Sequence, residues 1–511
     1  MNLNYISTRS KDTKPLTSAE AILQGLAADG GLLVPDEIPT IKIKEIKELA
    51  KMKYEDKAVN ILSRFLTDYT ERELKECAEL AYDWFDIHDR TRLAIISDKP
   101  ENAKKIHANK NNVKAILELW HGPTSAFKDM ALQILPQLMR VALKKTGESH
   151  EILILVATSG DTGKAALAGF ADVPQTKIMV FYPDGGVSKI QRLQMVTQKG
   201  NNVNVTAVKG NFDDCQNGVK KIFNDEEIAK QLENYNVKLS SANSINWGRL
   251  VPQIVYYFSA YADLISNQEI NAGDTVNIVV PTGNFGNILA AYYAKKMGLP
   301  VDKLICASNI NNILTDFFNT GVYDRNRSFF KTITPSMDIL ISSNLERLLY
   351  HETNDPDYIK SLMEQLNTTG KYEINQELKN KLDKIFYADY AGEDETKNMI
   401  SHMFKDMNYL IDTHTAVAIA VTAKYIQKTH DKKPFIIAST ASAYKFAPAV
   451  LTAIGENISK FDEFEQLEKL NKLSGVPIPQ GLASLKKAEI LHNDVCEGAD
   501  MAEKVLAFAK I

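Results

Sequence analysis

Cysteine is scarce in this sequence. Only four occur in 511 residues, namely Cys77, Cys215, Cys306 and Cys496. No two of them form a C-x-x-C pair and no short Cys/His cluster is present, so the spacing of a zinc site or of a disulfide framework is missing. We therefore expect no metal, and we interpret the four cysteines as buried thiols in a reducing compartment.

Long hydrophobic runs and an excess of charge of one sign are also missing. No segment reaches the roughly 18 uninterrupted apolar residues of a membrane span, and the first residues, MNLNYISTRSKDTK, lack the apolar core of a secretory signal. The 60 basic and 64 acidic residues leave a formal net charge of only -4, which provides no field to attract nucleic acid or an anionic membrane. We expect a cytoplasmic protein with neither of these partners.

The chain is too long for one hydrophobic core, since single cores stop growing near about 250 to 300 residues. Residues 1–95 carry apolar residues at intervals of three and four, which predicts a mostly helical N-terminal domain. Residues 151–225 alternate β-branched runs with helical patterns, which predicts a small α/β domain with a parallel sheet. Residues 96–150 and 226–511 are assigned to a larger α/β domain with a helical insertion near 320–410. The predicted fold class is α/β.

Two predicted strands end in glycine-rich turns that open helices, ATSGDTGK at 157–164 and PTGNFGN at 281–287. Free N–H groups at a helix start bind anions well, although such turns also serve only to connect a strand to a helix. The first turn is no nucleotide P-loop, because only two residues separate Gly160 from Gly163 and Ala165 follows Lys164. The second turn lacks the GxGxxG pattern of nicotinamide cofactors.

A lysine upstream of both turns is the main chemical candidate. Lys128 lies in ELWHGPTSAFKDM, directly before the apolar helix pattern DMALQILPQLM. Burial there would lower its pKa and favour the free amine that Schiff-base chemistry requires. Taken alone, the pattern permits this role or that of an ordinary surface lysine.

Four motifs, HGPTSAFKDM, ATSGDTG, PTGNFGN and IDTHTAVA, occur in the order and approximate spacing of the threonine synthases, and NYISTRS and DGGLLVP near the N-terminus extend the resemblance. That family belongs to the pyridoxal 5′-phosphate enzymes of fold type II, which resemble the tryptophan synthase β subunit. The resemblance implies two parallel-sheet α/β domains with the cofactor between them.

The resemblance also implies roles for individual residues. Lys128 is the lysine that binds the cofactor covalently and then transfers protons. The cofactor phosphate lies in the loop of Gly283, Asn284, Phe285, Gly286 and Asn287, and Thr440 faces the pyridine nitrogen. The substrate is bound by Ser159, Asp161, Thr162 and Arg249. Of these, Asp161 cannot pair with the substrate carboxylate while ionised, and Arg249 is the candidate for the substrate phosphate. His414 is left outside the catalytic set.

The implied activity is that of a lyase that converts O-phospho-L-homoserine and water to L-threonine and phosphate, and we expect a monomer or a homodimer. The alternatives are an amino-acid dehydratase or an O-phosphoserine-dependent synthase on the same fold, and a non-catalytic carrier of the cofactor. One departure concerns the stretch Ala441-Ser442-Ala443-Tyr444, because many threonine synthases have a histidine and a proline after the ring-facing hydroxyl. We expect the neighbouring wall of the substrate site to differ accordingly.

Overall fold

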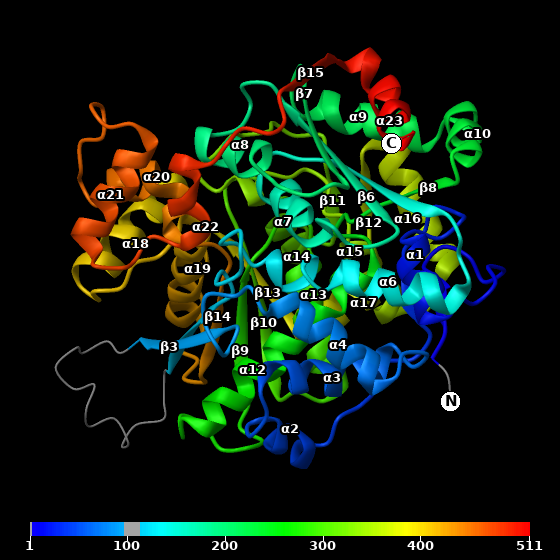
Figure 1. Ribbon diagram of the computed structural model, residues 1–511. Coiled ribbons are helices and arrows are strands. Elements are labelled where there is room, and N and C mark those ends of the chain that lie inside the picture. Colours follow the sequence, from blue (N-terminus) through cyan, green and yellow to red (C-terminus); the bar gives the residue numbers. More distant parts are fainter. Residues whose placement is uncertain (1–2, 97–112, 511) are drawn as a thin grey trace.

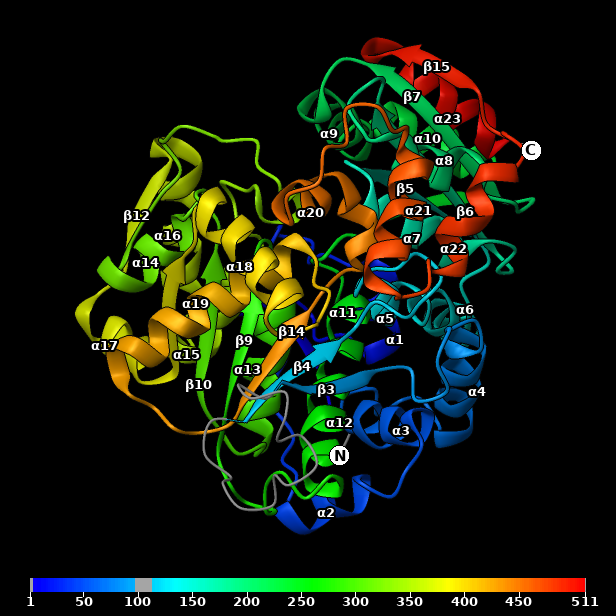
Figure 2. The same ribbon diagram turned by 90° about the vertical axis from the view of Figure 1, so that its left-hand side faces the viewer.

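The computed structural model describes residues 3–96 and 113–510 (Figure 1). Residues 97–112, which belong to the predicted large-domain segment 96–150, lie outside the described residues. Two sheets organise the molecule. Figures 1 and 2 show the smaller sheet beside the C-terminal helix and the larger sheet below it, with short helices between the two.

The larger sheet has six strands in the order β13-β10-β9-β14-β4-β3. Neighbouring strands are parallel except for β3, which is antiparallel to β4. The strands are β3 (Arg92–Ile96), β4 (Lys114–Glu118), β9 (Val276–Pro281), β10 (Val301–Ser308), β13 (Phe386–Tyr390) and β14 (Phe435–Ser439). The central strands β9 and β14 are buried along their whole length, which explains their mostly apolar composition, since helices cover both faces of a parallel sheet.

The smaller sheet has five parallel strands in the order β15-β7-β6-β5-β8. The strands are β5 (Glu151–Ala157), β6 (Thr176–Pro183), β7 (Val203–Lys209), β8 (Val237–Ser240) and β15 (Asp494–Glu497). The sequence analysis assigned 226–511 to the larger domain, yet β8 and β15 come from that range and pair in the smaller sheet. Both are short and partly polar, so no strand pattern marked them. The division into domains by residue range stays a prediction.

The N-terminal region combines four helices with a short antiparallel strand pair. These elements are β1 (Tyr5–Ser7), α1 (Ser18–Gln24), β2 (Leu33–Pro35), α2 (Ile43–Leu49), α3 (Tyr54–Phe65) and α4 (Glu71–Tyr82). Helices α2 and α3 pack on α12 (Pro252–Ser266), and α1 and α4 pack on α6 (Leu135–Thr146). One continuous hydrophobic core runs through these helices and one side of both sheets, so the N-terminal region packs as part of the same folded unit.

The remaining helices cover the two sheets and connect them. Around the smaller sheet lie α7 (Asp161–Phe170), α8 (Lys189–Val196), α9 (Phe212–Phe223), α10 (Glu226–Asn234) and α23 (Met501–Ala509). Beside the larger sheet lie α5 (Asp129–Leu132), α11 (Trp247–Leu250), α13 (Gly286–Met297), α14 (Ile313–Thr320), α19 (Thr413–Thr429), α20 (Ala447–Ala453), α21 (Glu463–Ser474) and α22 (Gln480–Ala483). Figure 2 shows α5, α7 and α11 in the middle of the molecule, between the sheets.

The predicted insertion near 320–410 is mostly helical, but it also contributes β13 to the edge of the larger sheet. Its other elements are β11 (Val322–Asp324), α15 (Leu345–Thr353), α16 (Pro356–Thr369), β12 (Lys371–Glu373), α17 (Gln376–Ile385) and α18 (Glu393–Lys405). None of the helices in the described residues combines the length and the apolar character needed to cross a membrane.

The four cysteines are buried free thiols, as predicted. Burial raises the pKa of Cys77 and of Cys306 to about 12, so both are protonated near neutral pH. Within the described residues, no group of three or more His, Cys, Asp and Glu side chains is placed to hold a metal ion.

Helix α7 packs so closely on the end of α5 that only glycine fits at position 169. A Cβ atom there would lie 2.0 Å from the carbonyl oxygen of Leu132. We expect Gly169→Ala to reduce the free energy of unfolding by about 1–3 kcal/mol, because backbone atoms would have to move apart. Thermal unfolding measures the effect against Gly498→Ala, whose added Cβ meets no atom within 4 Å. Equal melting temperatures of the two variants would contradict the prediction.

Candidate active site

Loops that follow four strands meet between the two sheets, where the carboxyl ends of parallel strands form binding sites. They follow β4, β5, β9 and β14. Two of them are joined directly. The N–H of Phe127 donates to the carbonyl of Thr440 (2.8 Å), and the N–H of Ser442 donates to the carbonyl of Ser125 (3.1 Å). These two hydrogen bonds fix Lys128 next to the end of β14.

The turn before Lys128 is held by a buried carboxylate. Asp129 accepts hydrogen bonds from the backbone N–H (2.8 Å) and the hydroxyl (2.7 Å) of Thr124. Gly122 must be glycine for this arrangement, because a Cβ atom would lie 2.5 Å from that of Asp129. Burial raises the pKa of Asp129 to about 6 in spite of these hydrogen bonds. The Gly-Pro turn in the sequence therefore serves to aim Lys128 into the space between the sheets.

The amine of Lys128 is almost enclosed, since only 11% of the side chain is exposed. Its Nζ lies 3.3 Å from Asp161 Oδ2, 3.4 Å from Ser336 Oγ and 5.0 Å from the centre of the Phe127 ring. Burial lowers the pKa of Lys128, and the positive charges of Arg249 and Lys445 add to this effect, while Asp161 opposes it. The site therefore favours the neutral, nucleophilic form of this amine more than water does.

Asp161 lies between two ammonium groups. Its Oδ2 faces Lys128, and its Oδ1 forms an ion pair with Lys445 at 2.8 Å. Burial works against ionisation, but the charges of Lys445 and Lys128 outweigh it and hold the pKa of Asp161 well below its usual range. The carboxylate is thus ionised and engaged on both oxygens. An ionised carboxylate in this position repels a second carboxylate, so the role of Asp161 toward a substrate stays a prediction.

Lys445 is a site residue that the sequence analysis missed. It comes directly after the stretch Ala441-Ser442-Ala443-Tyr444, which was noted only as a departure from the family pattern. Its side chain is completely buried, which is rare for lysine and requires a partner. The available signal was that Lys445 is the one charged residue in the apolar segment AYKFAPAV, which is typical of a buried ion pair. Its partner lies in α7, however, and cannot be identified from the local sequence.

The glycine-rich loop after β9 presents backbone donors. In the described part of the chain, the N–H groups of Gly283, Asn284 and Phe285 have no acceptor. The loop is tightly held, since Ser342 Oγ donates to the carbonyl of Gly283 (2.8 Å) and a Cβ at Gly283 would lie 2.4 Å from the carbonyl oxygen of Ser336. These donors sit at the start of α13, where the helix dipole also favours an anion.

Phe285 contributes only its backbone to this loop. Its φ is +64°, which is unusual for a residue other than glycine and is typical of functional sites. The ring is buried and packs against Phe318 and Phe386, with 5.9 Å between ring centres in each pair. This packing stabilises the left-handed turn that directs the N–H groups outward.

The two asparagines of the loop differ in their environment. Asn287 is buried, and its Oδ1 accepts hydrogen bonds from the hydroxyls of Tyr256 (2.6 Å) and Tyr257 (2.5 Å), while its Nδ2 has no partner among the described residues. Asn284 is exposed, and its carbonyl accepts from the backbone (3.2 Å) and Nδ2 (3.1 Å) of Asn344. Asn344 therefore holds the loop from the side of the insertion.

The N-terminal motifs support this loop from outside the site. Arg347 is fully buried and donates to Asn344 Oδ1 (2.5 Å), to the carbonyl of Leu33 (3.0 Å) and to that of Ile245 (2.5 Å). Leu33 belongs to the DGGLLVP motif, so Arg347 links that motif through Asn344 to the loop after β9. Neither the role of the motif nor that of Arg347 was visible in the sequence.

Arg249 is a buried cation near Lys128. Only 7% of the residue is exposed, and it donates one hydrogen bond, from Nη1 to the carbonyl of Ala242 (3.0 Å). In the part of the chain that the structure describes, no carboxylate pairs with it. Burial lowers its pKa to about 10. A buried guanidinium with unused donors is well suited to an anionic ligand, because an unpaired charge is otherwise costly to bury.

The three predicted hydroxyl groups lie at the rims of these loops. Thr440 is buried, and its hydroxyl has no hydrogen-bond partner among the described residues. Ser159 is exposed and Thr162 is half-buried, on the turn that opens α7. The hydroxyl of Thr158 shapes that turn, because it accepts hydrogen bonds from the N–H groups of Gly160 (3.0 Å) and Gly163 (2.9 Å).

His414 has both ring nitrogens engaged by the protein. Its Nε2 accepts a hydrogen bond from the N–H of Ser336 (3.2 Å), so Nδ1 carries the proton and donates to Asp412 (2.9 Å). Ser336 in turn contacts Lys128. His414 therefore positions a neighbour of the lysine.

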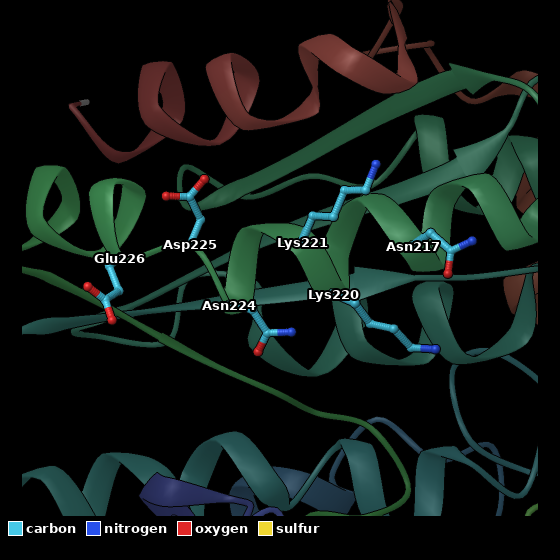
Figure 3. A pocket seen from close by; sticks show the side chains of 6 residues that line it. All are labelled: Asn217, Lys220, Lys221, Asn224, Asp225 and Glu226. Carbon is cyan, nitrogen blue, oxygen red and sulfur yellow. The ribbon is translucent and has the colours of Figure 1, made fainter. Parts of the chain in front are cut away.

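A surface hollow elsewhere has none of these properties. It has a volume of about 750 Å³ and is lined by Asn217, Lys220, Lys221, Asn224, Asp225 and Glu226, at the end of α9 and the start of α10. Figure 3 shows that the two lysines point to opposite sides of α9 and that the other side chains do not converge. No predicted site residue lines it, and we assign it no function.

Three family models match the chain. "Threonine synthase N terminus" matches residues 4–82, "Pyridoxal-phosphate dependent enzyme" matches 104–440 and "Threonine synthase, C-terminal" matches 415–488. Threonine synthase of Saccharomyces cerevisiae is 35% identical over 511 residues, which cover 95% of this chain and 96% of the yeast protein.

Human threonine synthase-like 1 is 40% identical over 518 residues, which cover 97% of this chain. The match spans only about two thirds (67%) of the human protein. Among solved structures, PLP-bound threonine synthase from Brucella melitensis superposes with a TM-score of 0.86 at 34% identity, and the match covers 100% of both chains.

Proposed function

Since the chain belongs to the threonine synthase family of pyridoxal-phosphate-dependent enzymes, we propose that it converts O-phospho-L-homoserine and water to L-threonine and phosphate at the site around Lys128. The family matches and the Brucella structure confirm the predicted resemblance, the α/β fold of this enzyme class and the cofactor. The observation that carries the proposal is the enclosed amine of Lys128, with lowered pKa, at the carboxyl ends of both sheets.

The residues present fit pyridoxal phosphate. The unused N–H groups of Gly283, Asn284 and Phe285 match a phosphate, and there is room for it, because a Cβ at Gly286 would meet no protein atom closer than 3.6 Å. The free hydroxyl of Thr440 suits the ring nitrogen, and the amine of Lys128 suits the aldehyde. A neutral hydroxyl does not force a proton onto the ring as a carboxylate would.

When bound, pyridoxal phosphate supplies the electron sink that makes the protons on the substrate's Cα and then Cβ removable. Lys128 takes the proton from Cα and then a proton from Cβ. It returns a proton at Cγ after phosphate has left, and another at Cα after water has added its hydroxyl at Cβ. Proton transfer by a positioned amine of lowered pKa contributes about 10²–10⁴-fold to such a rate. Asp161 and Ser336 hold the amine of Lys128 at the place where these transfers occur.

Substrate recognition falls to residues of both sheets. Arg249 binds the substrate phosphate through donors that the protein leaves unused. The turn at the start of α7, with Ser159 and Thr162, receives the substrate carboxylate through its hydroxyls and N–H groups. The side chain of Asp161 is not a ligand of that carboxylate, because it is ionised.

Measurement of phosphate release from O-phospho-L-homoserine, with the amino-acid product identified, tests the function. Stoichiometric L-threonine and phosphate are expected. Ammonia release from threonine, or turnover of O-phospho-L-serine in place of the homoserine ester, would instead favour a dehydratase or an O-phosphoserine-dependent synthase.

Gly286→Ala tests the phosphate loop. The added Cβ clashes with no protein atom, so folding without cofactor should be unchanged, whereas it enters the space proposed for the cofactor phosphate. We expect the dissociation constant for pyridoxal phosphate to rise by about 10-fold to 100-fold, through loss of charge-assisted hydrogen bonds. Absorbance titration of the cofactor-free protein measures it. Gly392→Ala, in an open position far from the loop, is the control. Unchanged affinity in Gly286→Ala would place the phosphate elsewhere.

Two further properties complete the proposal. We propose a cytoplasmic enzyme that works as a monomer or a homodimer without nucleic-acid or membrane partners. Light scattering on the purified full-length chain tests the oligomeric state, and imaging of the tagged protein in its native cell tests the location.

A further inference from the structure

The ammonium of Lys445 is held by three oxygens of the protein. Its ammonium lies 2.8 Å from Asp161 Oδ1, 3.0 Å from the carbonyl of Thr124 and 3.4 Å from Gln194 Oε1. The contact with Asp161 is an ion pair, and the other two are hydrogen bonds that the ammonium donates to neutral protein oxygens. The side chain is also completely buried. Lys445 therefore does not bind the reacting molecule itself.

The partners of Lys445 join separate parts of the site. Asp161 opens α7 on the smaller sheet, Gln194 lies in α8, and Thr124 belongs to the turn that aims Lys128. The carboxylate of Asp161 faces Lys445 on one oxygen and Lys128 on the other. Of these two cations, Lys128 is the one that reacts, so its charge is not available throughout the reaction. Lys445 takes no part in the chemistry and keeps its charge throughout.

We propose that Lys445 is a positioning residue that compensates the charge of Asp161 whenever Lys128 is engaged, and so keeps the site able to accept a doubly anionic substrate. The proposal rests on the proposed function, because O-phospho-L-homoserine carries a carboxylate and a phosphate. Without Lys445, an ionised Asp161 beside them would repel both groups, and a buried carboxylate without a partner is costly. Lys445 also opposes the pull of Asp161 on the proton of Lys128.

The other ionisable groups around these three are few. They are Arg249 on α11, His414 on α19, Lys164 on α7 and Asp129 on α5. All of them remain in the variants below, so the changes measured there report the pair Lys445 and Asp161.

The first test follows the visible absorption of the bound cofactor against pH in the holoenzyme. This absorption reports the protonation of the nitrogen of Lys128. Lys445→Met removes a neighbouring cation and should raise the pH midpoint by about one unit, whereas Asp161→Asn removes the anion and should lower it by a similar amount. Lys486→Met, which changes an exposed lysine, is the control and should leave the midpoint unchanged. Midpoints that stay equal in all variants would overturn the proposal.

The second test uses steady-state kinetics with O-phospho-L-homoserine. Lys445→Met should raise KM by tenfold or more, and Lys445→Arg, which keeps the charge, should recover most of the loss. The double variant Asp161→Asn/Lys445→Met should have a lower KM than Lys445→Met alone, because the uncompensated carboxylate is gone. If Lys445 had a purely structural role, the KM of the double variant would be no lower than that of Lys445→Met. That result would overturn the proposal.

Two further outcomes have a defined meaning. If Lys445→Met does not fold, the pH midpoint of cofactor absorption in Asp161→Asn tests the proposal instead. A midpoint that is not lower than that of the unchanged protein overturns the proposal. If the absorption midpoints shift as expected but phosphohomoserine is not turned over, charge compensation of Asp161 is supported and the proposed function alone fails.

Discussion

Lys128→Ala is expected to lower kcat for threonine formation by about 10³-fold or more, since we propose that this side chain both holds the cofactor and moves the protons. In the same variant, borohydride should no longer fix pyridoxal phosphate to the protein. In the unchanged chain, reduction should attach the cofactor to a single tryptic peptide that contains Lys128, as identified by mass spectrometry.

The structure allows this variant to fold. Asp161 keeps Lys445 as its partner, and the turn around Lys128 is held by Asp129 and by backbone hydrogen bonds to β14 and the following loop. We therefore expect a melting temperature of the cofactor-free variant within a few degrees of the cofactor-free parent. A loss of activity would then result from the missing amine and not from misfolding. Lys230→Ala, an exposed lysine on α10, is the matched control and should keep full activity.

Cofactor fixed to another lysine would contradict the assignment. The other candidate amines near Lys128 are those of Lys164 and Lys445. Burial lowers the pKa of Lys164 to about 8. Both are committed to protein partners, Lys164 to Gln198 Oε1 (2.5 Å) and Lys445 to Asp161. Lys128 alone of the three faces Ser336 and the loop after β9.

Arg249→Met should make the protein more stable and much less active. Removal of a buried guanidinium without a carboxylate partner relieves its desolvation, so we expect the cofactor-free melting temperature to rise by roughly 2–4 °C. The same change removes the donors proposed for the substrate phosphate. We expect kcat/KM for phosphohomoserine to fall by about 10²-fold, mainly through KM, which corresponds to the loss of charge-assisted hydrogen bonds.

Inorganic phosphate separates the two effects. It should raise the melting temperature of the unchanged holoenzyme, where the cofactor already fills its own phosphate loop, and should have little effect on Arg249→Met. Arg249→Lys keeps the charge but loses the planar fork of donors. The rise in its melting temperature with phosphate should therefore lie between that of the unchanged holoenzyme and that of Arg249→Met. Arg325→Met, at a half-buried arginine of the insertion, is the control. If Arg249→Met were destabilised and kept its KM, Arg249 would be a structural residue.

Most of the candidate site residues lie in short motifs that could be recognised in the sequence. Lys128, the loop after β9 and Thr440 come together between the sheets because each follows a strand whose apolar run is readable in the sequence. The strand order and the contacts between motifs are not readable in the same way. The sheet membership of β8 and β15 was missed for this reason, since short polar strands are recognised only by their neighbours.

The amino-acid sequence by itself predicted the fold class, the candidate lysine and two turns suited to anions, because these depend on side chains and backbone conformations within a few residues of each other. Only the tertiary structure decided that Asp161 lies between Lys128 and Lys445, that Arg249 is buried without a carboxylate, and that Arg347 links the N-terminal motif to the cofactor loop. Charge pairing acts over a few ångströms in space, and folding alone brings residues so far apart along the chain within that range.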